Sequence, residues 1–456
     1  MPTANFAQLS QALEQRQIAV WNAKSARWQG IPVALSSLTI DPLSWESLSI
    51  DAKSVLDAFP YLLTWLQRKE RSLLWQALFS RLSDSEKWAA MQNPKDTWGH
   101  ATLRFDLYWH KTQWMVIEVN CTIPAMQAYS DMLMEAWQEA TRVQILPRTS
   151  NSLDLWNSLA SLYYANGGLA KKPVVLILHR SGDSQLAELE YHQHQWSSFA
   201  DVLCATPEVC RVDHDGIYVG NRKIDLVYRH VFASVLESYP EWVPLLKKNR
   251  TFHIYNPISA HYEVKGFLAL LSEVASDAAL SAEVGLNPVH IRGINRRVPW
   301  TRLIHSYSNG LLNSPSDVTE DYFTSDIEDL VVKNSVGYGG QSVFIGGEWF
   351  SERSQNRLQK LMNVTETVTP KSFFNWIVHT SSDTWIVQKR MEGHRFNSEI
   401  IGKDGVKSTV DGFADASIFL NTSSSSPPRC GGVSRFGDHA IVNIGAGGGL
   451  VPFLIG

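Results

Sequence analysis

Cysteine is scarce in this sequence, and the few cysteines that it has are far apart. The chain has 456 residues and four cysteines, none of them in a C-x-x-C pair: Cys121, Cys204, Cys210 and Cys430. A disulfide framework needs paired cysteines in an oxidising compartment. We therefore expect a reduced, cytoplasmic protein.

Long apolar runs and clusters of basic residues are also missing. No run is long enough to span a bilayer, and Met1 to Gln8 lack the basic start and apolar core of a signal peptide. The net charge is −4 and the pI about 6.4, with no basic block, which gives no support for nucleic-acid binding. With 44% apolar and 19% charged residues, the composition is that of a soluble globular protein of about two or three domains.

The clearest pattern that is present is an alternating pair of segments, 103–109 and 114–120. Apolar and polar residues alternate in both arms, which predicts a two-stranded hairpin with one face in a core. With Lys111 to Gln113 as a three-residue loop, Asp106 would face Glu118 and Arg104 would face Asn120.

Facing carboxylates repel each other, so a cation is expected between Asp106 and Glu118. Two carboxylates and the Asn120 amide form an all-oxygen ligand set, which suits Mg²⁺ held jointly with the phosphates of a nucleotide. The alternative interpretation is that Arg104 simply neutralises the two acids on a solvated hairpin face, because short patterns recur by chance.

Two regions flank this hairpin in the sequence. Residues 1–97 have apolar residues at helical spacing and no chemical motif, so we interpret them as a helical cap or a dimer surface. Residues 151–262 alternate buried strands with helices, which predicts a parallel-sheet lobe. Arg180 and Arg229 follow or end such strands, where ligands gather; each could grip a substrate carboxylate or pair with a local acid.

The last third, residues 326–456, is predicted to be strand-rich after a helical connector at 263–325. A strand ends in Lys333 and leads into a glycine-rich loop with Gly337, Gly339 and Gly340. Glycine loops can lie flat on phosphates, but this one does not match a P-loop. A later strand carries Gln388, Lys389 and Met391, and Arg435 follows a glycine pair.

Together these motifs resemble the ATP-grasp ligases in circularly permuted form, and among them the glutathionylspermidine synthase-like group. R-x-D and E-x-N at residues 104–106 and 118–120 precede the lysine strand and glycine loop, whereas an ordinary ATP-grasp chain has the nucleotide half first. The resemblance covers residues 98–456 in patches. Lys389 stands where many relatives have an acid, and residues 1–97 match nothing in the group.

The resemblance implies an α/β fold with α+β lobes, in which residues 98–150 and 326–456 form the two parts of the ATP-grasp domain and residues 151–262 a pre-ATP-grasp-like lobe. It also implies that ATP and Mg²⁺ are used to join a carboxylic acid to an amine through an acyl phosphate, with release of ADP and phosphate. It implies catalysis by Arg104 and Arg435, metal binding by Asp106, Glu118 and Asn120, and nucleotide binding by Lys333, Gly337, Gly339, Gly340, Gln388, Lys389 and Met391.

Alternatives to the ligase are a silent ATP-binding regulator or scaffold and an ATP-dependent phosphotransferase. Arg435 could equally form a structural salt bridge, and the second nucleotide lysine is left open. The expected partners are a small acid and an amine (an amino acid, a polyamine or a short peptide), with no nucleic acid and no membrane, and a homodimer is left open. The ligase hypothesis requires that Asp106, Glu118 and Asn120 meet Lys333 across a cleft.

Overall fold

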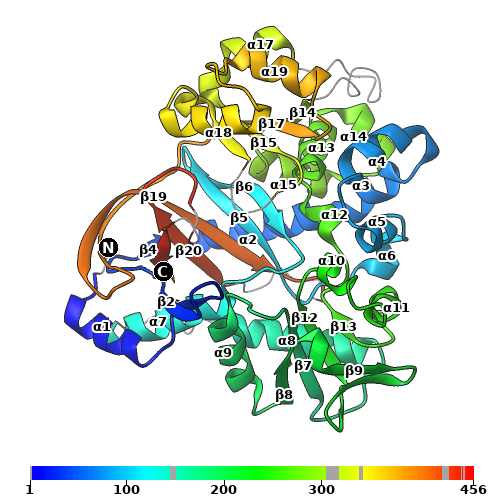
Figure 1. Ribbon diagram of the computed structural model, residues 1–456, viewed down its shortest axis with the longest axis vertical. Helices are drawn as coiled ribbons and strands as arrows, with labels where there is room; N and C mark the ends of the chain where they lie inside the picture. Colours follow the sequence, from blue (N-terminus) through cyan, green and yellow to red (C-terminus); the bar gives the residue numbers. More distant parts are fainter. Residues whose placement is uncertain are drawn as a thin grey trace.

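The computed structural model describes residues 3–143, 150–304, 318–337, 342–423, 431–442, 444 and 447–456. Figure 1 shows a central sheet, a lobe of helices and strands at one end of it, and a second lobe with its own sheet at the other end. Within the described ranges, no helix is long and apolar enough to cross a membrane.

The central sheet carries the predicted hairpin. Its strand order is β18-β3-β21-β20-β19-β5-β6. In chain order these strands are β3 (Val33–Ala34), β5 (Leu103–His110), β6 (Gln113–Asn120), β18 (His394–Ile401), β19 (Lys407–Leu420), β20 (Gly432–Gly437) and β21 (Gly449–Val451). The apolar face of β5 is fully buried at Leu103, Phe105 and Leu107, and Phe59 stacks on Phe105 with 6.0 Å between ring centroids.

The hairpin has the predicted pairing but a different turn. Arg104 pairs with Asn120 and Asp106 with Glu118, as predicted. The strands end at His110 and resume at Gln113, so the loop is one residue shorter than expected. A bulge between Asp106 and Leu107 restores the register, because a bulge places an extra residue on one strand.

A four-stranded antiparallel sheet forms the core of the lobe that contains α17 to α19. Its order is β14-β17-β15-β16, with β14 (Thr301–Ile304), β15 (Leu330–Asn334), β16 (Val343–Ile345) and β17 (Trp385–Lys389). Three helices pack on it through a shared apolar cluster: α17 (Glu320–Ser325), α18 (Glu352–Met362) and α19 (Pro370–His379). The predicted strands on both sides of the glycine loop are therefore present.

The predicted parallel lobe is also present, at the other end of the molecule (Figure 1). Its sheet has the order β13-β12-β7-β8, all parallel: β7 (Val174–His179), β8 (Asp201–Ala205), β12 (Leu226–His230) and β13 (Ile254–Tyr255). Helices α8 (Asn151–Ala165) and α9 (Leu186–Trp196) belong to this lobe, as does a small antiparallel sheet of β9 (Cys210–Asp213), β10 (Gly216–Val219) and β11 (Arg222–Lys223).

The prediction that residues 1–97 are helical is only partly correct. The expected helices are α1 (Phe6–Glu14), α2 (Pro42–Asp57), α3 (Phe59–Leu66), α4 (Ser72–Phe79), α5 (Asp84–Ala90) and α6 (Pro94–Thr97). Between α1 and α2 the chain instead forms β1 (Ala19–Asn22), β2 (Arg27–Gly30), β3 and β4 (Leu38–Ile40). β3 joins the central sheet, and β4 pairs with β22 (Phe453–Ile455).

The predicted connector, residues 263–325, is not a separate helical unit. It does contain helices: α12 (Ala260–Glu263) overlaps its start, followed by α13 (Lys265–Ser276), α14 (Ala278–Val284) and α15 (Pro288–Arg297). It also supplies β14, which pairs with β17. The connector therefore belongs to the same sheet as Lys333.

Candidate functional site

The main cavity of the molecule brings both predicted halves of the site together. It encloses about 500 Å³ between the hairpin and the strands β15 and β17. Nine of the predicted residues line it: Arg104, Asp106, Glu118, Asn120, Lys333, Gln388, Lys389, Met391 and Arg435. Gly337, Arg180 and Arg229 do not line it, and Gly339 and Gly340 lie outside the described residues.

Lys333 joins the two halves directly. Its Nζ donates to Gln388 Oε1 at 2.7 Å and to the Ile117 carbonyl at 3.4 Å, a residue 216 positions away in the chain. Ile117 is the residue that the hairpin bulge leaves without a partner on β5. Burial lowers the pKa of Lys333 to about 8, against the opposing effect of the Glu118 carboxylate. A buried amine with few partners is suited to meet an anion in the cavity.

Lys265 is a second buried lysine in the cavity, and the sequence did not point to it. It is the first residue of α13. Its Nζ donates to the Gly337 carbonyl at 2.7 Å and pairs with Glu118 at 2.9 Å. The facing carboxylates of the hairpin required a nearby cation, but no local pattern marked residue 265 as its source.

Asp106 is surrounded by donors on both of its oxygens. Arg104 Nε lies 2.6 Å from Oδ1 and Arg104 Nη2 lies 3.1 Å from Oδ2. Ser417, its neighbour across the β5–β19 pair, donates to Oδ1 at 3.0 Å, and Arg435 donates to Oδ2 at 3.2 Å. Burial works to raise the pKa of Asp106, but Arg104 and Arg435 hold it well below its usual value.

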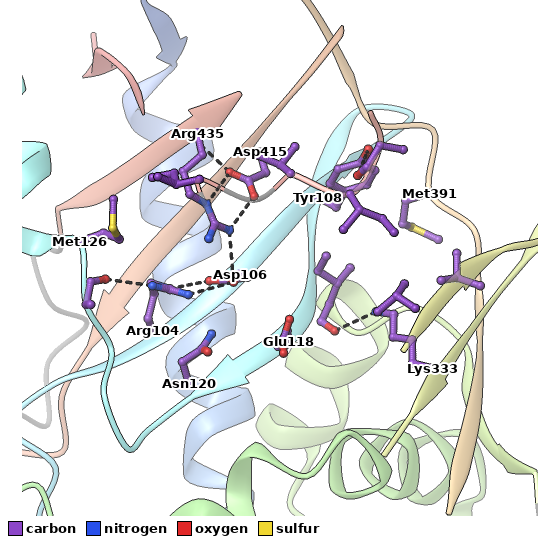
Figure 2. A pocket seen from close by; sticks show the side chains of 18 of the residues that line it. Arg104, Asp106, Tyr108, Glu118, Asn120, Met126, Lys333, Met391, Asp415 and Arg435 are labelled. Carbon is purple, nitrogen blue, oxygen red and sulfur yellow. Dashed lines mark hydrogen bonds and ion pairs between the residues drawn. The ribbon is translucent and has the colours of Figure 1, made fainter. Parts of the chain in front are cut away.

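Arg435 bridges Asp106 and a further buried acid, Asp415 (Figure 2). The Arg435 guanidinium grips Asp415 through Nε at 3.1 Å and Nη2 at 2.6 Å, and the two residues face each other across β19 and β20. Burial raises the pKa of Asp415 to about 6, although Arg435 opposes the shift. Asp415 was missed, and the available signal was an acid flanked by Ala414 and Ala416 inside an apolar strand.

The donor chemistry of the cavity partly fits the expected Mg²⁺ ion. Glu118 and Asn120 lie on one face of β6, and the Asn120 amide nitrogen is buried with no hydrogen-bond partner among the described residues. A carboxylate has about four lone-pair positions, and those of Asp106 are already met by four donors. No group of three or more His, Cys, Asp or Glu side chains among the described residues could hold a metal. Glu118 and Asn120 therefore fit an ion that also takes phosphate oxygens.

Two predicted substrate residues lie elsewhere. Arg229 is fully buried, and its three nitrogens donate to the carbonyls of Val231, Asn256 and Pro257. The prediction that it grips a substrate is wrong, because its guanidinium holds a chain segment in place and has no access to the cavity. Arg180 is half-exposed, pairs with Asp183 at 3.8 Å and does not line the cavity.

The residues that were predicted to bind a nucleotide differ in how firmly they are held. The Gln388 amide nitrogen donates to Thr301 at 3.0 Å while its oxygen accepts from Lys333. Lys389 is 41% exposed and pairs with Asp329 at 3.0 Å. Met391 packs with Tyr108. Gln388 is thus held in place by two hydrogen bonds, whereas Lys389 is a partly exposed cation at the edge of the cavity.

Comparison with solved structures shows a mixed α/β fold that is shared with a glutathione synthetase-like protein. The chain is similar to a glutathione synthetase-like effector from Globodera pallida in its apo form, with a TM-score of 0.61 and 11% identity over 99% of this chain and 96% of that chain. A protein assigned as a γ-glutamylcysteine synthetase from Methylobacillus flagellatus has a TM-score of 0.36 and 10% identity over 81% of this chain and 82% of that chain.

No model of a known protein family and no curated protein sequence matches the chain. The likeness to the Globodera pallida protein extends over nearly the full length of both chains, and it confirms the predicted resemblance at the level of the fold.

Proposed function

We propose that the protein is an ATP-dependent carboxylate–amine ligase that forms an amide through an acyl phosphate and releases ADP and phosphate. The observation that carries the proposal is the meeting of Lys333 and Lys265 with Glu118 and Asn120 in one cavity. These residues lie far apart in the chain, and their chemistry matches a nucleoside triphosphate with a cation.

The charge of the cavity supports an anionic occupant. Seven basic residues and three acids line it: Arg104, Lys265, Lys333, Lys389, Arg390, Lys403 and Arg435, against Asp106, Glu118 and Asp415. An excess of cations in a recessed site raises the local concentration of anions. A triphosphate and a carboxylate, which are the two substrates of the first step, are both anions.

In the first step, a carboxylate oxygen of the acid attacks the γ-phosphorus of ATP, and ADP leaves. Lys333 and Lys265 would neutralise the phosphates, and Gln388 and Met391 would border the adenine. Glu118 and Asn120 would hold Mg²⁺, which when bound neutralises the charge on the phosphates. Asp106, the third predicted ligand, would have to release an arginine contact before it could take part.

In the second step, the neutral amine attacks the acyl carbon, phosphate leaves with the oxygen that came from the acid, and the nitrogen loses a proton to the departing phosphate or to water. Arg104 would hold the acyl phosphate, and Arg435 would stabilise the negative charge of the tetrahedral intermediate. Asp106 and Asp415 would keep both guanidinium groups in position. The share of the protein in the reaction is thus orientation and charge stabilisation.

The test is a screen of acids and amines in pairs, with ADP and inorganic phosphate as the readout. The proposal expects release of both products only when both an acid and an amine are present. AMP in place of ADP contradicts it, because AMP signals adenylation. Phosphate that stays on the substrate would instead indicate a phosphotransferase.

A non-catalytic ATP-binding protein is the second candidate, and the hydrogen bonds of Asp106 favour it. All four acceptor positions of Asp106 are engaged by protein donors, which is an arrangement that a retired metal site could adopt. This candidate expects Mg-ATP binding without ADP release on any pair of substrates.

A further inference from the structure

Figure 2 shows that Arg104 and Met126 lie on one side of the view and that Lys333 and Met391 lie on the other, so the cavity has two ends with different chemistry. At one end, Tyr108 and Ile117 face Lys333 and Met391. At the other end, Arg104 donates to the Ala125 carbonyl at 2.9 Å, so this end continues toward the segment before α7 (Gln127–Thr141). The nucleotide residues occupy the first end, which leaves the second for the acid.

The second end is walled by apolar side chains. Its apolar lining is Val20, Ile31, Pro32, Ile123 and Met126, which we call the apolar wall. Gln29, Ser184 and Gln185 are neutral polar residues that also line the cavity.

The N-terminal part of the wall is held in place on several sides. The Trp21 amide donates to the Ser184 carbonyl at 2.8 Å, and the Leu450 amide donates to the Pro32 carbonyl at 2.8 Å. Tyr129 donates to the Ala19 carbonyl at 2.8 Å. The β1–β2 pair is also fastened by Trp21 and Trp28, which face each other with ring centroids 5.4 Å apart. The wall is therefore a built surface and not a loose terminus.

Each acid that lines the cavity among the described residues already has a basic partner. Asp106 and Asp415 are paired with arginines, and Glu118 is paired with Lys265. Lys403 lines the cavity but is exposed, and its carbonyl lies beside Gly30. A buried ammonium without a partner is strongly disfavoured, and here a polyamine or the α-ammonium of a γ-glutamyl group would have to compete with Lys265, Arg104 or Arg435 for a carboxylate.

We propose that the apolar wall binds the uncharged body of a small apolar carboxylic acid, such as a short aliphatic or aryl-alkyl acid. The proposal rests on the proposed ligase function, because it assigns the acid of that same reaction. The carboxylate would lie toward Arg104 and Asn120, and the apolar part would lie against Val20, Ile31 and Met126. The wall then excludes polyamines and γ-glutamyl peptides as the group bound at this end.

Isothermal titration calorimetry on the full chain with Mg²⁺ and a non-hydrolysable ATP analogue tests this directly. The probes are hexanoate, 3-phenylpropionate, γ-glutamylcysteine and spermidine. We expect either apolar acid to bind at least about tenfold more tightly than γ-glutamylcysteine or spermidine. Tighter binding of either charged probe, or no binding of either apolar acid, overturns the proposal.

A variant pair locates the binding. Val20→Asp, at a half-buried position in β1, is expected to weaken binding of the apolar acids at least about tenfold. Val219→Asp is the control, because Val219 is also a half-buried strand valine but does not line the cavity. Equal losses in both variants, or no loss in Val20→Asp, would contradict the assignment.

These experiments distinguish a failure of the apolar-wall proposal from a failure of the ligase proposal. Preference for a charged acid together with ADP release would overturn the apolar wall and leave the ligase intact. Apolar binding without ADP release on any pair of substrates would support the wall as a binding surface and overturn the ligase.

Discussion

Two buried arginines show how differently the central sheet and the parallel lobe use the same side chain. Arg229, at the carboxyl end of β12, donates to three backbone carbonyls and meets no carboxylate in a hydrogen bond. Arg435, on β20, is held between Asp106 and Asp415 and lines the cavity. Burial lowers the pKa of Arg229 to about 10 even though Glu263 opposes the shift. The pKa of Arg435 is raised despite burial, because Asp415 and Asp106 favour its charge.

The difference shows that burial alone does not distinguish the two arginines, whereas their hydrogen-bond partners do. Carbonyl partners fix a backbone, so the guanidinium acts as a brace. Carboxylate partners can be exchanged for phosphate or a developing oxyanion, since these offer the same bidentate geometry. Arg435 therefore combines a structural pair with a role in the cavity, and the two interpretations of it need not exclude each other.

The largest expected effect separates the two arginines. Arg435→Lys keeps the positive charge but loses the paired N–H donors of the guanidinium group, so kcat for ADP release should fall about 100- to 1,000-fold. Arg229→Lys should leave the kcat of the folded protein within about threefold but lower the free energy of unfolding by about 3 kcal/mol, because buried carbonyls lose donors. Kinetics and urea unfolding on both variants check this. A large fall in kcat in Arg229→Lys, with little change in Arg435→Lys, would contradict this comparison.

Next in size is the loss of ATP affinity in Lys333→Met. Removing a charged donor should weaken Mg-ATP binding about 10- to 100-fold, while the apo protein should be no less stable, since burial disfavours the charge of Lys333. Lys389→Met is the matched control, because Lys389 lines the same cavity but is 41% exposed and paired with Asp329. Calorimetry should show that the control changes the affinity for Mg-ATP by less than about threefold. Equal losses of affinity in both variants would contradict a specific role of Lys333 in nucleotide binding.

A smaller effect is expected on the pH dependence of stability. Lys333 has a pKa of about 8 in the folded protein against 10.5 as its ordinary value, so between these pH values the unfolded chain binds more protons. The contribution of Lys333 to the free energy of unfolding should therefore rise with pH across this window. Urea unfolding at pH 7.5 and 9.5 should show a steeper rise for the wild type than for Lys333→Met. Parallel slopes would contradict the buried charge.

The smallest effect concerns Asp415, which burial gives a pKa of about 6. Below that pH the acid is neutral and holds Arg435 less firmly, so kcat should fall as the pH drops from 7 to 5. Asp415→Asn should resemble the low-pH form, with kcat several-fold lower at pH 7 and nearly constant across this range. If the variant kept the acid limb of the wild type, Asp415 would not be the titrating group.

The site residues in segments where apolar and polar residues alternate regularly could be predicted from the sequence. Arg104 and Asp106 share a face of β5, and the motif order pointed to Lys333 and Arg435, which line the same cavity. The pairing of Asp106 with Glu118 was also predicted, but the loop was one residue too long in the prediction. No local sequence pattern indicates the β-bulge between Asp106 and Leu107 that restores the register.

The parts that depend on distant partners could not be predicted. Lys265 is a functional candidate only because α13 brings it to Glu118 and Gly337. The strands β3 and β4 are two and three residues long and gain their pairing from β18, β21 and β22, so no periodicity could reveal them. Arg229 was misassigned because an arginine at a strand end is equally consistent with carbonyl partners.

Transfer of ¹⁸O from the acid to phosphate tests the central claim most directly. With a carboxylate labelled in both oxygens and an amine that together support turnover, ³¹P NMR should find one ¹⁸O atom in each inorganic phosphate released, and ADP as the nucleotide product. In Lys333→Met, labelled phosphate should form more slowly at subsaturating ATP, in step with the loss of ATP affinity. Unlabelled phosphate, or ¹⁸O in AMP, would contradict an acyl-phosphate ligase.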